Sequence, residues 1–581
     1  GGSSPGRTSA RVRGSGRPAS GRPASCRVGR TFSSVCLFGV RGARRAAART
    51  PALVHRARAP SVQNRMFVAC HVRMRWVGAL VVFAVGLRML LPSTMTEPPQ
   101  ALPAFLSWTK REALAHLAGE APASRLVLIM GNDAGDLDSA ASAIALSYVL
   151  AHAPTYAAAQ GFPEGTTFAP LVQTPRAELA QRRENLLVYE ALGIALDALL
   201  TVDDLGVDVG TSVALSPHAN VGLGLVDHAR LAPAWGTERH VDLVVDHHED
   251  DGLYMDARLR IVRAPSRDPV GSCASLVADV YADALRNTDG RMDRAVADLL
   301  LSAIVLDTNH VRMAPAGKAT PTDAEAFVRL VPASSFAYDA APHFAKIAAQ
   351  YGAQTTLPDA DGTPGAAAPG VTRDAQAHTR AWSRALRAVK GDVAHLDTAA
   401  LLSRDLKTVW APTPRGQVVL GVASVPVSVA AWVSGAYRTG DEPASTTHAA
   451  AEAEWRAWWL ALRAFMAARR IDVLAVLCAY TDRDLGERAR DLVLMYAANA
   501  HDDSVFSAVL EKLVSRTRPS LDVTPYVSPR LVDGAPEHPL ALSTDDRLDS
   551  EVHAAVFSQG NVRANRKVVL PVLLEVLQTA D

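Results

Sequence analysis

Apolar runs of strand length alternate with stretches of helical spacing from Arg125 onward. Runs at 125–130, 167–174, 221–227, 241–246 and 258–263 predict strands, and 139–152, 185–192, 272–285 and 292–306 predict helices. Further along, strands are predicted near 416–424, 472–479 and 490–496, with helices at 449–469 and 568–578. Strands that alternate with helices favour a largely parallel sheet covered on both faces. We therefore expect an α/β protein with a second α/β region after the first.

The basic character of the chain belongs to its first hundred residues. Residues 1–96 hold 17 arginines and no lysine or acidic residue, whereas the rest holds 43 basic against 59 acidic residues. This composition is typical of a mitochondrial transit peptide and equally of translated GC-rich upstream sequence. The apolar run 76–92 contains Arg88 and is slightly shorter than the ~20 residues of a bilayer span. We expect residues 1–95 to be a disordered or leader-like extension, with membrane contact only if 76–92 is a real anchor.

The cysteines constrain the compartment. Only Cys273 and Cys478 lie beyond the basic extension, so neither a disulfide framework nor a cysteine-rich zinc site is available there. This usage suits a reducing compartment. We expect a cytoplasmic protein, or a mitochondrial one if the extension is a genuine transit peptide. Cys273 is expected to be a buried small residue, because no base is identifiable beside it.

Acidic and histidine residues follow four of the apolar elements. In open α/β sheets, ligands bind outside the carboxyl ends of the strands, which makes these positions the candidate site. The four positions are Asp136 and Asp138 after the first strand, Asp227 in LVDH, Asp246-His247-His248 in VDHHED, and Asp307 in LDTNH. Asp136 and Asp138 can point at one site, although Asp138 could equally cap the helix that follows.

The triplet Asp246-His247-His248 directly follows the apolar run Leu243-Val244-Val245. Burying three unpaired ionisable groups is expensive, and a bound metal would remove that cost. Neutral imidazole together with carboxylate suits Mn²⁺, Fe²⁺, Zn²⁺ or Co²⁺, while carboxylate-rich sites also suit Mg²⁺. The sequence therefore predicts a metal site without fixing the ion.

The ordered motifs GNDAGDLDS, LVDH, VDHHED and LDTNH resemble those of the DHH phosphoesterase superfamily, and Asp246-His247-His248 matches its eponymous triplet. The details are most similar to eukaryotic exopolyphosphatase and its relative prune, in which Asn also follows the Gly of the first motif. The matching segments outside the four motifs are 268–277 (DPVGSCASLV), 318–323 (KATPTD), 401–407 (LLSRDLK) and 561–571 (NVRANRKVVLP). The resemblance covers roughly residues 100–581.

The resemblance implies an exopolyphosphatase that uses a metal-bound hydroxide. It implies two divalent cations, Mn²⁺ or Mg²⁺ with Co²⁺ as an alternative, and inorganic polyphosphate or another small phosphoanhydride as substrate. The implied metal ligands are Asp136, Asp138, Asp227, His247 and Asp307, with Asp227 bridging. The implied catalytic residues are Asp227, Asp246 and His248, with His248 touching a phosphoryl oxygen more than a metal. The implied substrate-binding residues are Asn132, Lys407, Arg563, Arg566 and Lys567.

The resemblance also implies a domain plan with the active site in the cleft between two domains. A DHH domain is expected at 96–340, and a smaller α/β DHH-associated domain that binds substrate at 381–581. Between them, 341–380 is expected to be a linker or insertion, because 355–375 is rich in Pro, Gly and Ala.

Several alternatives remain at this point. Soluble pyrophosphatases of the superfamily carry a metal-binding His where this chain has Asn132, so a manganese-dependent pyrophosphatase is a rival reading. A prune-like phosphodiesterase or signalling scaffold is another. DHH enzymes that cleave nucleic acids carry a Gly-Gly-Gly-His motif that does not occur in this sequence, so no nucleic-acid partner is expected. The basic run 563–567 could be a solvated helix start, although cations there oppose the helix dipole and so favour a bound anion. Trp455, Trp458 and Trp459 are expected in a helix core.

Overall fold

The computed structural model describes residues 97–120, 125–206, 220–236, 239–285, 293–313, 317–338, 341–351, 370–440, 448–482, 485–497, 503–516, 519–526 and 552–579. These residues belong to one compact unit, Thr94–Asp581. The expected extension 1–95, with its apolar run 76–92, lies outside the described residues, as does most of the stretch 355–375. Within the described residues, no helix has the length and apolar character needed to span a bilayer.

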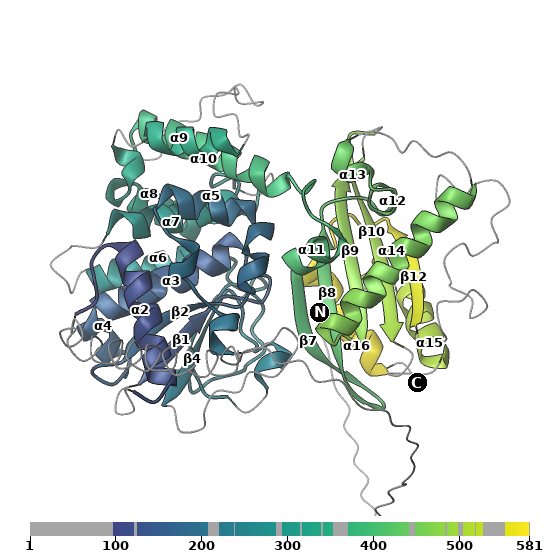
Figure 1. The fold of residues 1–581 in the computed structure, drawn as a ribbon, viewed down its shortest axis with the longest axis horizontal. Helices are drawn as coiled ribbons and strands as arrows, with labels where there is room; N and C mark the ends of the chain where they lie inside the picture. Colours follow the sequence, from purple (N-terminus) through teal and green to yellow (C-terminus); the bar gives the residue numbers. More distant parts are fainter. Residues whose placement is uncertain are drawn as a thin grey trace, which may run out of the picture. The chain divides into compact units, whose positions relative to one another are not determined.

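The first sheet has six parallel strands in the order β3-β2-β1-β4-β5-β6 (Figure 1). The strands are β1 (Leu126–Met130), β2 (Thr167–Val172), β3 (Leu200–Thr201), β4 (Val221–Val226), β5 (Val241–Asp246) and β6 (Leu259–Val262). The helices of this part are α2 (Leu102–Leu117), α3 (Leu137–His152), α4 (Pro154–Ala159), α5 (Arg183–Ala191), α6 (Cys273–Leu285), α7 (Arg294–Asp307) and α8 (Pro321–Leu330). The predicted parallel sheet and its five longer strands are confirmed.

Both faces of the first sheet are buried, which explains why its strands read as continuous apolar runs. Val127 and Ile129 of β1 belong to a large core that α3, α6 and α7 help to build. Leu128 and Met130 point to the other face, where a smaller core includes Ala113 of α2 and Trp235. Because both faces are covered, the polar motifs lie where the strands end and not on a face of the sheet.

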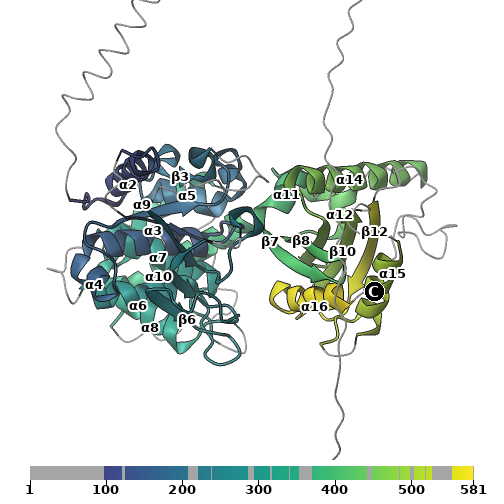
Figure 2. The same cartoon turned by 90° about the horizontal axis from the view of Figure 1, so that it is seen from below.

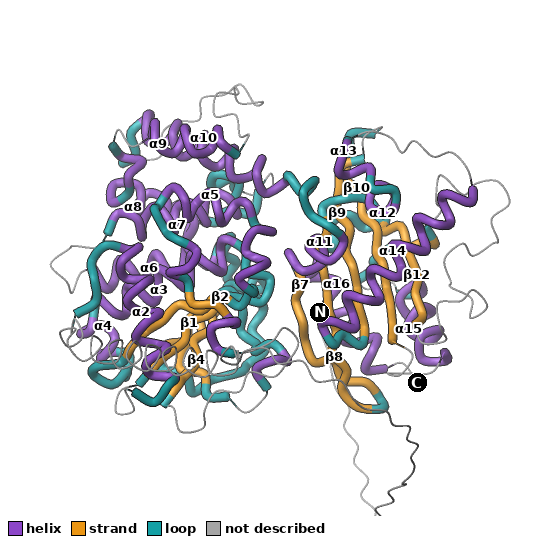
Figure 3. The backbone as a smooth tube through the Cα atoms, in the orientation of Figure 1, coloured by secondary structure: helices purple, strands orange, loops and turns teal. Residues whose placement is uncertain are grey.

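The second sheet is mostly antiparallel, in the order β11-β12-β10-β9-β8-β7, and among its described strands only β8 and β9 pair in parallel. Figure 3 shows the strands of this sheet in orange. Its strands are β7 (Leu406–Thr413), β8 (Gly416–Val425), β9 (Val473–Thr481), β10 (Arg488–Ala497), β11 (Val523–Pro525) and β12 (Val552–Gln559). Its helices are α11 (Thr398–Arg404), α12 (Val429–Val433), α13 (Ala436–Thr439), α14 (His448–Arg469), α15 (Asp503–Ser515) and α16 (Arg566–Thr579).

Helices cover both faces of the second sheet (Figure 2). On one face, Trp455, Trp458 and Trp459 of α14 pack into the core with α11 and α12, so the predicted core role of these tryptophans is confirmed. On the other face, α15 and α16 build a separate core that contains Leu513 and Leu573.

The segment expected as a linker, 341–380, contains helical structure in its described part. It forms α9 (Ala341–Gln350) and the beginning of α10 (Arg373–Gly391). Phe344 and Ile347 of α9 and Trp382 of α10 all lie in the large core of the first sheet. Apolar burial on both sides of the Pro/Gly/Ala-rich stretch therefore ties these helices to the first sheet, and the expected domain boundaries stay a prediction.

A buried ionic network joins the first sheet's helices to the start of the second region. Glu184 of α5 is fully buried and pairs with Arg182 at 3.2 Å and with Arg404 of α11 at 3.1 Å. Arg182 Nε also donates to the carbonyl of Ala134 at 2.6 Å, and Arg404 Nη2 donates to that of Lys390 at 2.6 Å. Burial alone would raise the pKa of Glu184, but the charges of Arg404 and Arg182 hold this pKa below its usual value.

The first prediction concerns this network. Glu184→Ala should lower the free energy of unfolding by about 3–5 kcal/mol, because it leaves two buried guanidinium groups without their counter-ion. Urea unfolding followed by circular dichroism measures the change. The matched control is Glu164→Ala, since Glu164 is exposed, and it should stay within about 0.5 kcal/mol of the wild type. Equal stability of both variants would show that the network is dispensable.

Candidate functional site

The loop between β1 and α3 is shaped by close packing and a helix cap. A Cβ at Gly131 would lie 2.5 Å from that of Ser139, so only glycine lets the loop pass this close to the helix. Asp136 caps α3, because its Oδ1 accepts the N–H of Ser139 at 3.0 Å. The cap is therefore Asp136, and the alternative in which Asp138 merely caps this helix is wrong.

Asp227 is the centre toward which the other groups point. It follows β4, is buried with 3 % of its surface exposed, and has a φ of 61°, a left-handed conformation that costs a non-glycine residue about 1–3 kcal/mol. Its Oδ2 accepts hydrogen bonds from Asn132 Nδ2 at 2.7 Å and from Ser139 Oγ at 2.6 Å. These two donors leave Oδ1 to face His247, whose Nε2 lies 3.2 Å away.

The tautomer of His247 follows from its other neighbour. Its Nδ1 lies 2.9 Å from the carbonyl oxygen of Val270, which can only accept a hydrogen bond, so Nδ1 carries the proton. A neutral His247 then turns a lone pair at Nε2 toward Asp227 Oδ1. Two acceptors that face each other require a cation between them, either a proton or a metal ion.

The second histidine of the triplet is oriented by the triplet's own aspartate. His248 Nδ1 lies 2.8 Å from Asp246 Oδ1, and Asp246 is fully buried. Among the described residues, Asp246 Oδ2 is also buried and finds no hydrogen-bond partner. Burial lowers the pKa of His248 to about 4. Ligand atoms of Asp227, His247 and His248 lie within 4.8 Å of one another, a spacing that suits a single ion.

Asp138 and Asp307 approach from two other helices. Asp138 accepts hydrogen bonds from Ser272 Oγ at 2.8 Å and from the N–H of Cys273 at 2.7 Å, so it sits at the N-terminus of α6. Asp307 ends α7 and pairs with Lys318 at 2.7 Å. Beyond it, Asn309, His310 and Val311 have φ values of 53°, 57° and 57°. A left-handed β-branched residue is rare, so strain accumulates directly after Asp307.

The carboxylates raise one another's affinity for protons. Burial, and then the neighbouring Asp227 and Asp307, raise the pKa of Asp138 to about 8. Burial, and then Asp227, also raise the pKa of Asp136. By contrast, contacts with His247 and His248 outweigh burial and hold the pKa of Asp227 well below its usual value. The site therefore concentrates negative charge that a divalent cation would neutralise.

Basic residues of the second region lie beside the same cluster of carboxylates and histidines. Thr408 of β7 donates from its N–H and its hydroxyl to Asp133 Oδ2, at 2.8 and 2.9 Å, which fixes β7 against the first motif and sets Lys407 beside it. Burial, and then the charges of Lys318 and Lys407, lower the pKa of Lys567, so both of these lysines lie near Lys567.

The two predicted arginines behave differently from the lysines. Arg566, the first residue of α16, donates to the backbone oxygen of Asp405 at 2.8 Å and to its Oδ1 at 2.9 Å. Arg563 is exposed in the turn before α16. The structure thus brings together the carboxylates, both histidines, Asn132, Lys407 and Lys567. Arg566 lies at the edge of this group, where it contacts Asp405, and Arg563 lies on the surface.

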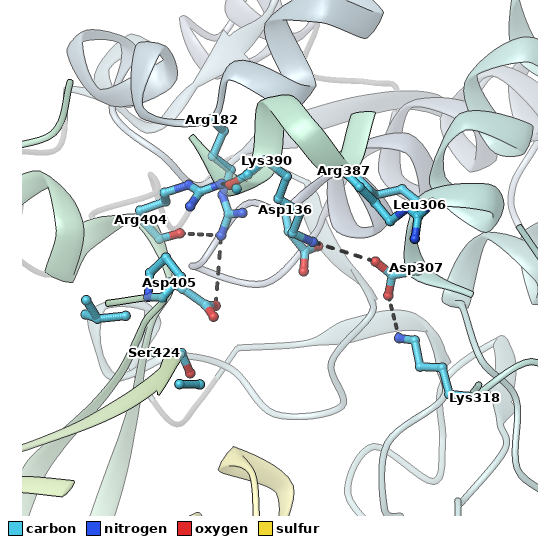
Figure 4. A pocket seen from close by; sticks show the side chains of 14 residues that line it. Asp136, Arg182, Leu306, Asp307, Lys318, Arg387, Lys390, Arg404, Asp405 and Ser424 are labelled. Carbon is cyan, nitrogen blue, oxygen red and sulfur yellow. Dashed lines mark hydrogen bonds and ion pairs between the residues drawn. The ribbon is translucent and has the colours of Figure 1, made fainter. Parts of the chain in front are cut away.

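Sequence reasoning missed several groups at the site. Lys318 lies in the KATPTD segment, where Asp323 binds the N–H groups of Gly271 and Thr320 and so holds two distant loops together. Lys390 Nζ lies 3.9 Å from Asp307 Oδ1 (Figure 4). The match to KATPTD could have identified Lys318, whereas Lys390 belongs to α10 and no motif marked it.

Comparisons with known proteins agree with this geometry. The family description "DHH family, N-terminal domain" matches residues 126–304, and "DHHA2 domain" matches residues 384–576. The chain therefore belongs to the DHH phosphoesterases, a metal-dependent family, and carries a DHHA2 domain after its DHH domain.

Among individual relatives, the chain is similar to proteins named exopolyphosphatase PRUNE1. It is 25% identical to that of Rattus norvegicus over 453 residues, which is 78% of this chain and 75% of the relative. The human protein is 24% identical over 453 residues, with 78% and 76% covered. The protein of Bos taurus is 32% identical over 197 residues, with 34% and 39% covered.

The second prediction tests the central carboxylate. Asp227→Asn keeps the shape of the side chain but removes its charge, so affinity for Mn²⁺ should fall by at least about tenfold. Titration calorimetry on the full chain measures it. The control is Asp256→Asn, which changes an exposed aspartate and should leave Mn²⁺ affinity unaltered. Equal affinity in the Asp227 variant would contradict its role as a ligand.

Proposed function

We propose that this protein is a metal-dependent phosphoanhydride hydrolase that removes terminal phosphate from inorganic polyphosphate. One observation carries the proposal. A buried cluster of carboxylates and imidazoles around Asp227 lies beside three lysines, Lys318, Lys407 and Lys567, that come from both regions of the chain. A metal-ligand set next to a set of cations suits a substrate that is a polyanion. The names of the relatives support the same substrate class.

The donor set fits divalent cations. We assign two ions, Mn²⁺ or Mg²⁺ with Co²⁺ also compatible, to Asp136, Asp138, Asp227, His247 and Asp307, with Asp227 shared between them. When bound, such ions supply Lewis acidity and make a water molecule acidic enough to attack near neutral pH. Two buried atoms support an ion at this place. Nε2 of His247 carries a lone pair, and Oδ2 of Asp246 has no hydrogen-bond partner among the described residues.

The chain's own groups supply orientation and charge. Asn132 and Ser139 hold Asp227 by its Oδ2, so its Oδ1 stays directed at His247. Asp246 holds Nδ1 of His248, which leaves Nε2 as the atom that His248 is proposed to direct at a phosphoryl oxygen. Lys407, Arg563, Arg566 and Lys567 are proposed to neutralise phosphate from the second region.

The orientation of Asn132 supports polyphosphate over pyrophosphate specialisation. Its Oδ1 accepts the N–H of Ala134 at 3.0 Å and its Nδ2 donates to Asp227. Its Nδ2 has no lone pair for a metal, and its Oδ1 is a weaker ligand than imidazole nitrogen and already accepts one hydrogen bond. One ion should therefore be held less tightly here than in a site with that histidine.

The third prediction is the substrate profile. Purified full-length protein is mixed with long-chain polyphosphate, tripolyphosphate, pyrophosphate or cyclic AMP, in Mn²⁺ and in Mg²⁺, and released phosphate or AMP is quantified. We expect kcat/KM to be highest on polyphosphate and to vanish with a chelator. Highest kcat/KM on pyrophosphate would make the protein a pyrophosphatase, turnover of cyclic AMP alone would make it a phosphodiesterase, and no turnover would favour a scaffold.

The fourth prediction separates substrate binding from metal binding. Lys567→Ala should raise KM for polyphosphate by about tenfold or more while leaving Mn²⁺ affinity intact, because a charge-assisted contact to phosphate is worth about 1.5–3 kcal/mol. The effect should shrink in added salt. Lys346→Ala, an exposed lysine of α9, is the control. Unchanged kinetics for Lys567→Ala at two ionic strengths would remove α16 from the site.

A further inference from the structure

A cavity of about 530 Å³ opens beside the metal-ligand cluster (Figure 4). Asp136 and Asp307 line it together with basic groups of α10 and with β8 of the second sheet. Its lining residues are Asp136, Arg182, Leu306, Asp307, Lys318, Arg387, Lys390, Gly391, Arg404, Asp405, Ser424, Val425, Pro426 and Ala479. The cavity therefore extends away from the reacting centre and is more basic than acidic.

Two of the arginines in this lining already have buried acidic partners. Arg182 and Arg404 share the buried carboxylate of Glu184. Asp405 lies 3.9 Å from Arg182 and also pairs with Arg566 at 2.9 Å. These groups have structural partners, so they do not explain the basic character of the cavity.

The remaining cations lack enough acidic partners. Lys318 and Lys390 both direct their ammonium groups at the one carboxylate of Asp307, at 2.7 and 3.9 Å. Within the described residues, the only hydrogen bond of the Arg387 side chain runs from Nε to the carbonyl of Ser383 at 3.4 Å, inside its own helix, and Arg387 forms no ion pair there.

The surroundings of Arg387 repel its charge. Burial, followed by the nearby positive charges of Arg384 and Arg312, lowers the pKa of Arg387. Arg387 and Lys390 are three residues apart on α10, so their side chains emerge on the same face of the helix. A guanidinium held among like charges, with no acidic side chain paired to it among the described residues, favours a bound anion.

Metal binding at Asp307 would strengthen the attraction of the cavity for an anion. A divalent cation held by that carboxylate would take up its negative charge, so Lys318 and Lys390 would lose it as an acidic partner. Both lysines would then be available to an anion in the cavity, together with Arg387.

We propose that Arg387 and Lys390 of α10, with Lys318 opposite, form an anion subsite that holds phosphates of the polyphosphate chain beyond the one that reacts. The proposal rests on the proposed hydrolase function and deepens it. Pyrophosphate has no phosphate left to place in this cavity once both of its own are at the metals and at Lys407 and Lys567. The subsite therefore selects long chains.

The test compares substrates of different length on one variant. Arg387→Ala is made in the full chain, and kcat/KM is measured with Mn²⁺ on long-chain polyphosphate, tripolyphosphate and pyrophosphate. We expect a loss of about tenfold or more on long chains and less than about threefold on pyrophosphate. Arg387→Glu should lose more, and added salt should reduce both losses. Arg373→Ala changes an exposed arginine at the start of the same helix and should behave as the wild type.

Two results would overturn the subsite: equal losses on all three substrates, or no loss on any. If the wild type releases no phosphate from any substrate, the proposed hydrolase function fails instead. Calorimetric binding of intact long-chain polyphosphate to wild type, Arg387→Ala and Arg373→Ala then decides the subsite alone. Weaker binding in Arg387→Ala only would support it, and equal binding in all three would reject it.

Discussion

The convergence of buried acids on Asp227 is the constraint on which the rest of the site depends. Burial, together with the nearby charges of Asp227 and Asp307, raises the pKa of Asp138 to about 8. Such a cluster is unfavourable unless positive charge enters it. Histidines, lysines and divalent cations are the available sources of that charge. The strained backbone at Asp227 shows that the fold holds this residue in place at a cost.

The parallel sheet explains how distant residues reach one point. Asp227 and the triplet around His247 follow neighbouring strands, β4 and β5, so their side chains emerge at one edge. Polar contacts hold the second region there: Thr408 binds Asp133, and Glu184 pairs with Arg404. These contacts place lysines from β7 and α16 beside the carboxylates of the first sheet, which is the arrangement that the proposed exopolyphosphatase function requires.

Local sequence signals predicted the elements better than the contacts between them. The apolar strands of the first sheet follow from their burial on both faces, and the acidic and histidine positions follow from where those strands end. By contrast, β7 is mostly half-exposed and its pattern is weak. The contact between Asp133 and Thr408 spans 275 residues, and the contact of Asp138 with the start of α6 depends on how two helices pack. Long-range packing sets both, and no local pattern encodes it.

Anomalous diffraction from crystals grown with Mn²⁺ tests the central claim most directly. The wavelength is set at the manganese edge, so the positions of the ions are observed without reference to activity. The account predicts anomalous peaks within coordination distance of Asp227 Oδ1 and His247 Nε2, about 2.0–2.2 Å, with Asp227 shared between two ions. Peaks absent from this cluster, or an ion bound away from Asp227, would contradict it.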